Sequence, residues 1–218
     1  YTLGSSDYFG SGCAWLNDVD SDGVMDLAVT AYGDDDGGGD SGAVYILFLT
    51  ATGYVKSAQK ISNFYGNMPY DLAASDDFGY GRSIGAADLD ADGITDLAVG
   101  APLDDDGGSD AGAVYILFLT TDGLVKSGQK ISNLYGGLPY TLDSSDNFGY
   151  SPTIGRGDLD NDGGADIAVG AVYDDDGRYD ECDNWDDCHD CDFHHNGDCD
   201  HRCDGWCWED NDHDGRFE

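Results

Sequence analysis

Apolar residues along this chain occur in short runs that glycine and aspartate interrupt. The segments 26–31 and 43–49 are such runs, and the second of them recurs unchanged at 113–119. β-Branched and aromatic residues bounded by Gly and Asp favour buried strands over helices. The pattern therefore predicts short strands and an all-β fold.

A further strand is expected after each long apolar run. Thr52-Gly53 and Asp122-Gly123 predict hairpin turns into strands at 55–61 and 125–131. These two strands carry all four lysines of the chain, namely Lys56, Lys60, Lys126 and Lys130. Because charged side chains protect exposed sheet edges, we expect a solvated outer edge strand in each sheet.

The chain is built from repeats. The motif Asp-x-Asp-x-Asp-Gly occurs at 18–23, 88–93 and 158–163, with a spacing of 70 residues, and 37 of the 53 positions in 18–70 are identical in 88–140. Four-stranded units of this size are typical of propeller blades. We expect a repeat domain over residues 1–177 with two complete four-stranded units and a partial third, at about 1–70, 71–140 and 141–177.

The chain begins in the middle of a recognisable pattern. Tyr1 has the same repeat phase as Tyr70 and Tyr140, and no initiator Met precedes it. We therefore expect the sequence to be a piece of a longer array.

The acidic motif predicts a calcium site. In the pattern Asp-x-Asp-x-Asp-Gly-x-x-Asp, the side chains at positions 1, 3, 5 and 9 and the carbonyl at position 7 converge, and Gly permits the sharp turn. Position 12 is a valine within a strand, so the loop is not an EF-hand. Three loops in register favour Ca2+ over plain acidic turns. The expected ligands are Asp18, Asp20, Asp22, the Val24 carbonyl and Asp26; Asp88, Asp90, Asp92, the Ile94 carbonyl and Asp96; and Asp158, Asp160, Asp162, the Gly164 carbonyl and Asp166.

Composition narrows the choice of partners. The chain has 45 acidic residues against nine Lys or Arg, for a formal net charge of −36, which excludes nucleic acid. No apolar run approaches the length of a membrane span.

Two further acidic loops, Asp34–Asp40 and Asp104–Asp110, are either second cation sites or solvated turns between strands.

The motifs together resemble a known family. Phe-Gly at the start of each unit, the acidic loop and Gly100-Ala101-Pro102 occur in the order found in the FG-GAP repeats of the integrin α-subunit β-propeller. The resemblance covers about residues 1–177. It implies four-stranded blades with calcium held in a loop between two strands of each blade. Gly-Ala-Pro is replaced by Thr30-Ala31-Tyr32 in the first unit and by Gly170-Ala171-Val172 in the third.

The tail, residues 178–218, has a different composition. It holds six of the seven cysteines and all five histidines. We expect a small module stapled by three disulfides, with a zinc site at Cys188-x-x-Cys191 and nearby histidines as the alternative. Cys13 is left over and is expected to be buried or paired outside the tail. A fourth acidic loop at the end of the tail offers the expected calcium ligands Asp210, Asp212, Asp214 and Glu218.

These features favour a structural role over catalysis. The first 188 residues lack histidine, so a Ser-His-Asp or Cys-His site would need the tail, and we expect no enzyme. The prediction is an extracellular calcium-binding repeat protein that forms a building block of a surface, matrix or fibre assembly. A short array leaves apolar end faces, so the expected partner is another copy in a head-to-tail assembly. The alternative is an adhesion or recognition module that binds a protein or glycan.

Overall fold

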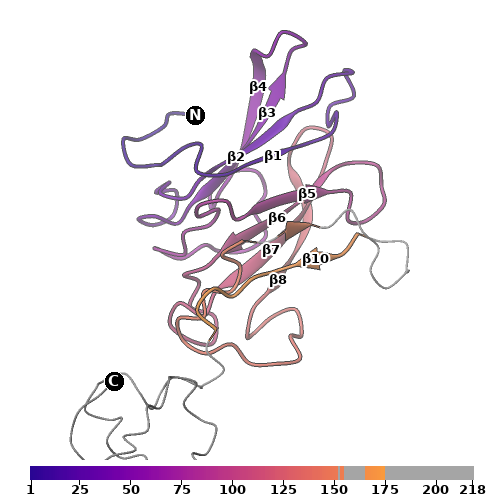
Figure 1. The fold of residues 1–218 in the computed structure, drawn as a ribbon. Coiled ribbons are helices and arrows are strands. Elements are labelled where there is room, and N and C mark those ends of the chain that lie inside the picture. Colours follow the sequence, from indigo (N-terminus) through magenta and orange to yellow (C-terminus); the bar gives the residue numbers. More distant parts are fainter. Residues whose placement is uncertain (152, 155–164, 175–218) are drawn as a thin grey trace, which may run out of the picture. The chain divides into compact units, whose positions relative to one another are not determined.

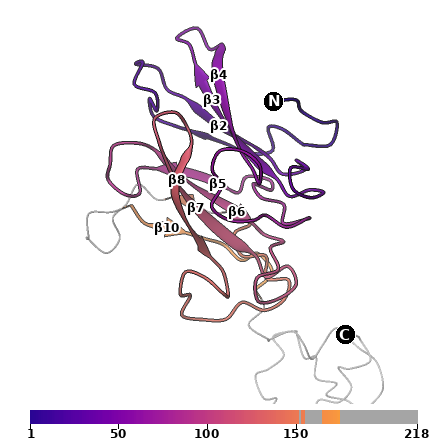
Figure 2. The same ribbon diagram turned by 180° about the vertical axis from the view of Figure 1, so that it is seen from behind.

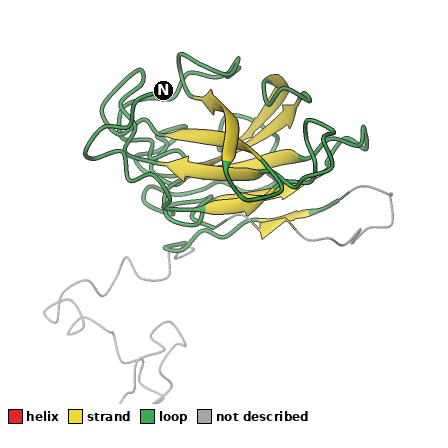
Figure 3. Cartoon of the chain, turned by 90° about the horizontal axis from the view of Figure 1, so that it is seen from above, coloured by secondary structure: helices red, strands yellow, loops and turns green. Residues whose placement is uncertain are grey.

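The structure of the protein is a computed structural model. It describes residues 1–151, 153–154 and 165–174, and residues Tyr1–Asp174 form one compact unit. All regular secondary structure among these residues is β, and Figure 3 shows strands joined by loops. The prediction of an all-β protein is therefore confirmed for the described residues. The Cys-rich tail lies outside them.

Each complete unit forms one four-stranded antiparallel sheet, as predicted. The first sheet has the strand order β1-β2-β3-β4, with β1 at Cys13–Trp15, β2 at Leu27–Ala31, β3 at Ala43–Leu49 and β4 at Val55–Ile61. The second has the order β5-β6-β7-β8, with β5 at Ile84–Ala87, β6 at Asp96–Ala101, β7 at Ala113–Leu119 and β8 at Val125–Ile131. A two-stranded sheet of β9, Thr153–Ile154, and β10, Ile167–Ala168, represents the partial third unit.

The two large sheets repeat the same register. Ala31 pairs with Ala43 in the first sheet as Ala101 pairs with Ala113 in the second. The β3–β4 and β7–β8 ladders each contain a bulge, at Phe48/Leu49 and at Phe118/Leu119. Near-identical sequences thus give near-identical blades, including their irregularities.

The main core lies between the two large sheets, which Figures 1 and 2 show packed on each other. Val44 and Ile46 of β3 belong to this core together with Tyr115 and Leu117 of β7. Side chains alternate between the two sides of a strand, so the even-numbered side of β3 meets the odd-numbered side of β7. The opposite side of the second sheet contributes to a separate cluster, against which Ile167 of β10 packs.

The Phe-Gly pair that opens each unit joins neighbouring units. Phe78 is fully buried in the core, and its backbone N donates to the Ser41 carbonyl of the first unit at 3.2 Å. Gly79 N donates to the Gly100 carbonyl of its own unit at 2.8 Å. This pair therefore ties a blade to the one before it.

Two expectations about side-chain burial are wrong. β4 and β8 are edge strands, but Lys60 and Lys130 on them are buried rather than solvated, because acidic side chains surround their ammonium groups. Cys13 is an exposed free cysteine on β1 and has no disulfide partner among the described residues. The described residues also include no helix with the length and apolar character that a membrane crossing requires.

Candidate metal centre in the acidic loops

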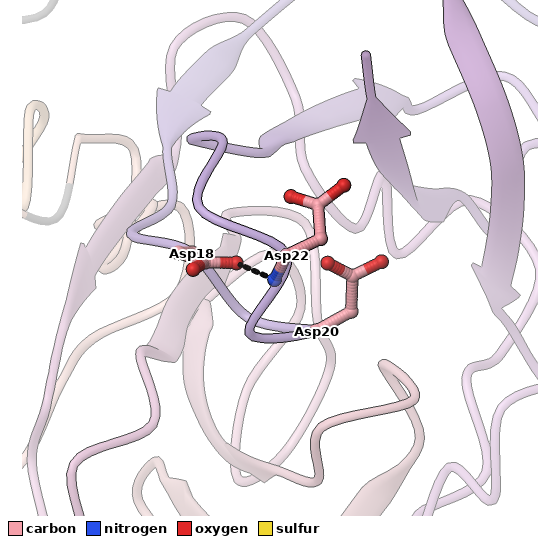
Figure 4. Close-up of side chains that lie close together, drawn as sticks. All are labelled: Asp18, Asp20 and Asp22. Carbon is pink, nitrogen blue, oxygen red and sulfur yellow. Dashed lines mark hydrogen bonds between the residues drawn. The ribbon is translucent and has the colours of Figure 1, made fainter. Parts of the chain in front are cut away.

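The first acidic loop connects β1 to β2 and gathers three carboxylates. Oxygens of Asp18, Asp20 and Asp22 lie within 4.8 Å of one another, and Figure 4 shows the three side chains on one turn. In the second unit, the cluster consists of Asp88 and Asp90 in the loop between β5 and β6 and of Asp96, the first residue of β6. The two clusters share positions 1 and 3 of the motif, whereas the third carboxylate comes from position 5 in the first unit and from position 9 in the second.

Backbone hydrogen bonds shape the turn. Asp18 accepts from the backbone N of Asp22 at 2.8 Å, the bond drawn in Figure 4, and from that of Gly23 at 2.7 Å. Asp22 in turn accepts from Val24 N at 2.9 Å. Gly23 has a φ of +90°, which explains the glycine at position 6 of the motif. In the second unit, Asp88 accepts from the backbone N of Asp92 and of Gly93, and Asp92 accepts from Ile94 N.

The aspartate at position 9 is buried and anchors the loop to the sheet. Asp26 accepts from Val19 N at 3.1 Å and from Leu49 N at 3.0 Å, at the end of β3. Asp96 does the same with Leu89 N and Leu119 N, both at 2.9 Å. Burial raises the pKa of Asp96, and its backbone hydrogen bonds oppose that effect.

The other expected ligands fall in different parts of the chain. Val24 and Ile94 lie in the turns, where their amide groups bond to Asp22 and Asp92. Asp166 is described and is half-buried immediately before β10. The remaining candidates lie outside the described residues, namely Asp158, Asp160, Asp162, Gly164, Asp210, Asp212, Asp214 and Glu218.

The donor set of these loops suits a hard divalent cation. Carboxylate oxygens are the ligands that Ca2+ prefers in proteins. Asp20 Oδ1 is shielded from solvent and has no hydrogen-bond partner among the described residues. A buried acceptor without a partner costs free energy, so this oxygen favours a bound cation. The residues present therefore fit a calcium ion.

A lysine reaches each acidic loop from the edge strand of the same sheet. Lys56 Nζ lies 2.7 Å from Asp20 Oδ2 and also bonds Asp22 Oδ2. Lys126 Nζ lies 2.8 Å from Asp90 Oδ2 and also bonds Asp92 Oδ2. The hydrogen bond from Lys56 lowers the pKa of Asp22, which keeps this carboxylate ionised.

The second acidic loops, Asp34–Asp40 and Asp104–Asp110, are organised around a buried lysine. Lys60 Nζ lies 2.7 Å from Asp34 Oδ2 and 2.6 Å from Asp36 Oδ2. The Tyr45 hydroxyl donates to Asp34 at 3.1 Å, and burial, then the Asp34 charge, raises the pKa of Tyr45 to about 12. Lys130, Asp104 and Asp106 repeat the arrangement. The expectation of solvated turns is wrong for Asp34 and Asp104, which are buried.

Sequence reasoning missed the four lysines as partners of the acidic loops. The offset of 34 residues between Asp22 and Lys56 recurs between Asp92 and Lys126 only because the units are duplicated. The available signal was the scarcity of cations, since nine basic residues face 45 acidic ones in this chain and each lysine is expected to lie near carboxylates.

Comparison with known proteins agrees with the repeat family that the sequence motifs predicted. The sequence profile of the FG-GAP repeat matches residues 9–47 and 80–117, which include all of β1, β2, β5 and β6 and the greater part of β3 and β7. Human integrin alpha-11 is 35% identical over 171 residues, 76% of this chain and 12% of the relative. Human integrin alpha-10 is 34% identical over 170 residues, 75% of this chain and 13% of the relative.

A third relative comes from an insect. Integrin alpha-PS5 of Drosophila melanogaster is 41% identical over 95 residues, 43% of this chain and 9% of the relative. The chain thus spans only about a tenth of the length of these integrin chains. It contains FG-GAP repeats, one in each of its two four-stranded sheets, as its sequence motifs predicted.

Proposed function

We propose that this chain is an extracellular repeat module whose acidic loops bind Ca2+ and stiffen each blade. One observation carries the proposal: three carboxylate oxygens of the acidic motif converge within 4.8 Å of one another in both complete units. Their mutual repulsion destabilises the loop unless positive charge offsets it. A divalent ion supplies that charge and links the two ends of the loop.

The chain's own residues prepare the site. Asp18 and Asp88 fold the turn through their backbone hydrogen bonds, while Asp26 and Asp96 fix it to the sheet. Asp20 and Asp90 present their carboxylates beside those residues. The carbonyls of Val24 and Ile94 would complete each set, and the equivalent residues of the third and fourth loops would bind in the same way.

Calcium titration tests this function. Isothermal titration calorimetry of the full chain should show calcium binding, and a chelator should lower the melting temperature. The double variant Asp20→Asn, Asp90→Asn should lose the part of the binding heat that belongs to these two loops. Asp71→Asn is the matched control, because Asp71 is exposed and outside both loops. Wild-type protein with no binding heat and an unchanged melting temperature in chelator would refute the proposal.

The module is proposed to work as a building block. The units are nearly identical, which suits stacking of one copy on the next better than recognition of a varied ligand. Calcium sites that need roughly millimolar calcium, and the disulfides expected in the tail, would both fit an extracellular or surface location. Mass measurement before and after reduction, with zinc analysis, tests whether the tail is oxidised.

Adhesion or recognition is a second candidate function. The similarity to integrin α chains favours it, with a protein or glycan as partner. Binding of the chain to immobilised matrix proteins and glycans, in calcium and in chelator, tests this alternative.

A further inference from the structure

Lys56 and Lys126 are placed on the acidic loops by an irregularity of the sheet. In the β3–β4 ladder, Ser57 pairs with Phe48 and Val55 pairs with Leu49, so Lys56 is the extra residue of a β-bulge. Lys126 has the same position between Ser127 and Val125 in the β7–β8 ladder. Bulges often turn a side chain toward a functional site. Both bulges turn a lysine toward the loop of their own sheet.

Each ammonium group bridges two carboxylates of the motif. Lys56 bonds the Oδ2 atoms of Asp20 and Asp22, which are positions 3 and 5 of the calcium pattern. A metal ion that uses these oxygens must share them with the lysine or displace it. Asp20 Oδ1, the buried oxygen without a partner, shows that the lysine alone leaves the loop incompletely satisfied.

Lys60, four residues further along β4, is a buried cation with which Lys56 can be compared. Its side chain is 6% exposed, and it also bridges two carboxylates, those of Asp34 and Asp36. The Lys56 side chain is 27% exposed. Lys56 can therefore move into solvent without opening the core, whereas Lys60 cannot.

We propose that Lys56 and Lys126 are built-in counter-ions that hold the loops in the metal-free protein and are displaced when Ca2+ binds. The inference rests on the proposed calcium function. Displacement makes each loop bind calcium more weakly than its carboxylates alone would, so the lysines set the calcium concentration at which the blades stiffen. They also limit carboxylate repulsion before calcium binds.

The charge of the lysine does not depend on pH in the ordinary range. Hydrogen bonds to Asp20 and Asp22 raise the pKa of Lys56 above its usual value, and those to Asp90 and Asp92 do the same for Lys126.

Amine labelling of the wild-type full chain tests the exchange directly. The chain is treated briefly with an acetylating reagent in calcium or in chelator, and labelling of each lysine is measured by mass spectrometry. Lys56 and Lys126 should be labelled several-fold faster in calcium. Lys60 and Lys130 should be protected in both conditions, because they are buried. Equal labelling of Lys56 and Lys126 in the two conditions would overturn the inference.

Calorimetry of variants gives a second measure. Lys56→Met with Lys126→Met should lower the calcium Kd of the two loops about two- to fivefold, the range expected for loss of exposed ion pairs. Lys56→Arg with Lys126→Arg should restore a Kd near the wild-type value. Arg82→Met is the control, since Arg82 is an exposed cation outside both loops. Calcium binding with an unchanged Kd in the Met variant contradicts the lysine inference alone, whereas absence of binding in the wild type contradicts the calcium function itself.

Discussion

Lys56 and Lys60 lie on one strand and each bonds two aspartates, but water reaches them very differently. Burial lowers the pKa of Lys60, yet its hydrogen bonds to Asp34 and Asp36 outweigh this effect and raise the pKa above the usual value. Its ammonium also lies 5.5 Å from the ring centroid of Tyr45. Lys60 is therefore a fixed part of the interior, and its loss leaves Asp34 as a buried charge without its counter-ion.

Lys60→Met is predicted to destabilise the protein by about 3–5 kcal/mol, the usual cost of breaking a buried ion pair from one side. Adding Asp34→Asn should recover part of the loss, because the remaining partner is then uncharged. Chemical denaturation of the three proteins measures both effects. Asp71→Asn, an exposed charge change, should be close to neutral. If Lys60→Met lost less unfolding free energy than Asp71→Asn, the assigned role of Lys60 would be contradicted.

Asp77 and Asn147 occupy the same position in successive units and show the effect of a single charge. Asn147 Nδ2 donates to the carbonyls of Asp110 at 3.0 Å and Pro102 at 3.2 Å. An ionised carboxylate at Asp77 has no proton to donate. Burial, and then the nearby Asp40 charge, raises the pKa of Asp77 to about 6.

A raised pKa in the folded state means that the folded protein holds this proton more tightly than the unfolded chain. Stability therefore falls as pH rises from about 4 to about 6, and the full cost persists above that range. Asp77→Asn should be more stable than wild type at pH 8, by on the order of 2 kcal/mol, and the difference should shrink toward pH 4. Thermal or denaturant unfolding across this range measures it. A difference that stays constant with pH would refute the assignment.

Some residues could be assigned from sequence because their chemistry is local. Asp18, Asp20 and Asp22 meet within one turn, so their spacing alone predicts a cluster. Lys60 is different, because it meets Asp34 only after β4 has paired with β3 in the observed register. The burial of a lysine side chain depends on such strand pairing and on packing against the next blade. The spacing of residues within one segment does not reveal either of them.

The strand that carries Gly-Ala-Pro passes very close to the Phe-Gly turn of the next unit. A Cβ atom at Gly100 would lie 1.8 Å from the Gly149 carbonyl oxygen, too near for any side chain. Gly170, the equivalent residue of the third unit, has no atom within 4 Å of such a Cβ. The close approach at Gly100 therefore comes from the neighbouring unit, not from the strand itself, and it is specific to the second unit, because Thr30 occupies the equivalent position of the first.

Gly100→Ala is predicted to destabilise the protein by about 1–3 kcal/mol, because the two backbones must separate. Gly170→Ala should have little effect, which makes it a matched control at the same repeat position. Differential scanning calorimetry compares the two variants with wild type. Equal melting temperatures for both alanine variants would show that the close approach is not maintained in solution.

The two complete units differ in which side of their sheet is covered by a neighbouring sheet. The odd-numbered side of β7 packs on the first sheet, and Leu117 is fully buried there. The same side of the first sheet holds only a small cluster of Ala31, Ala43 and Tyr45, with Leu47 partly exposed. The sequence predicted these strands but not which side meets which blade, because 43–49 and 113–119 are apolar on both sides and lack alternation.

This side of the first sheet is proposed to receive a second copy of the chain. Phe9 is 41% exposed, whereas its counterparts Phe78 and Phe148, which lie against a preceding sheet, are 0% and 5% exposed. Trp15, whose partner on β2 is Leu27, is 64% exposed. This surface has the same strands and the same Phe-Gly turn as the covered surface of the second sheet, although Trp15 stands where the second sheet has Ala86. It is therefore expected to accept a similar blade.

Head-to-tail contacts of this kind build rings or filaments, so the mass measured in calcium should grow with protein concentration. Trp15→Ser removes a large exposed side chain from the contact and should shift the distribution toward monomer. Tyr54→Ser is the control, because Tyr54 is 75% exposed but lies in the β3–β4 turn. Light scattering with size-exclusion chromatography measures the masses, and chelator should weaken assembly because the uncompensated negative charge then opposes contact. Wild-type protein that remains a monomer at high concentration in calcium would exclude self-assembly through this face.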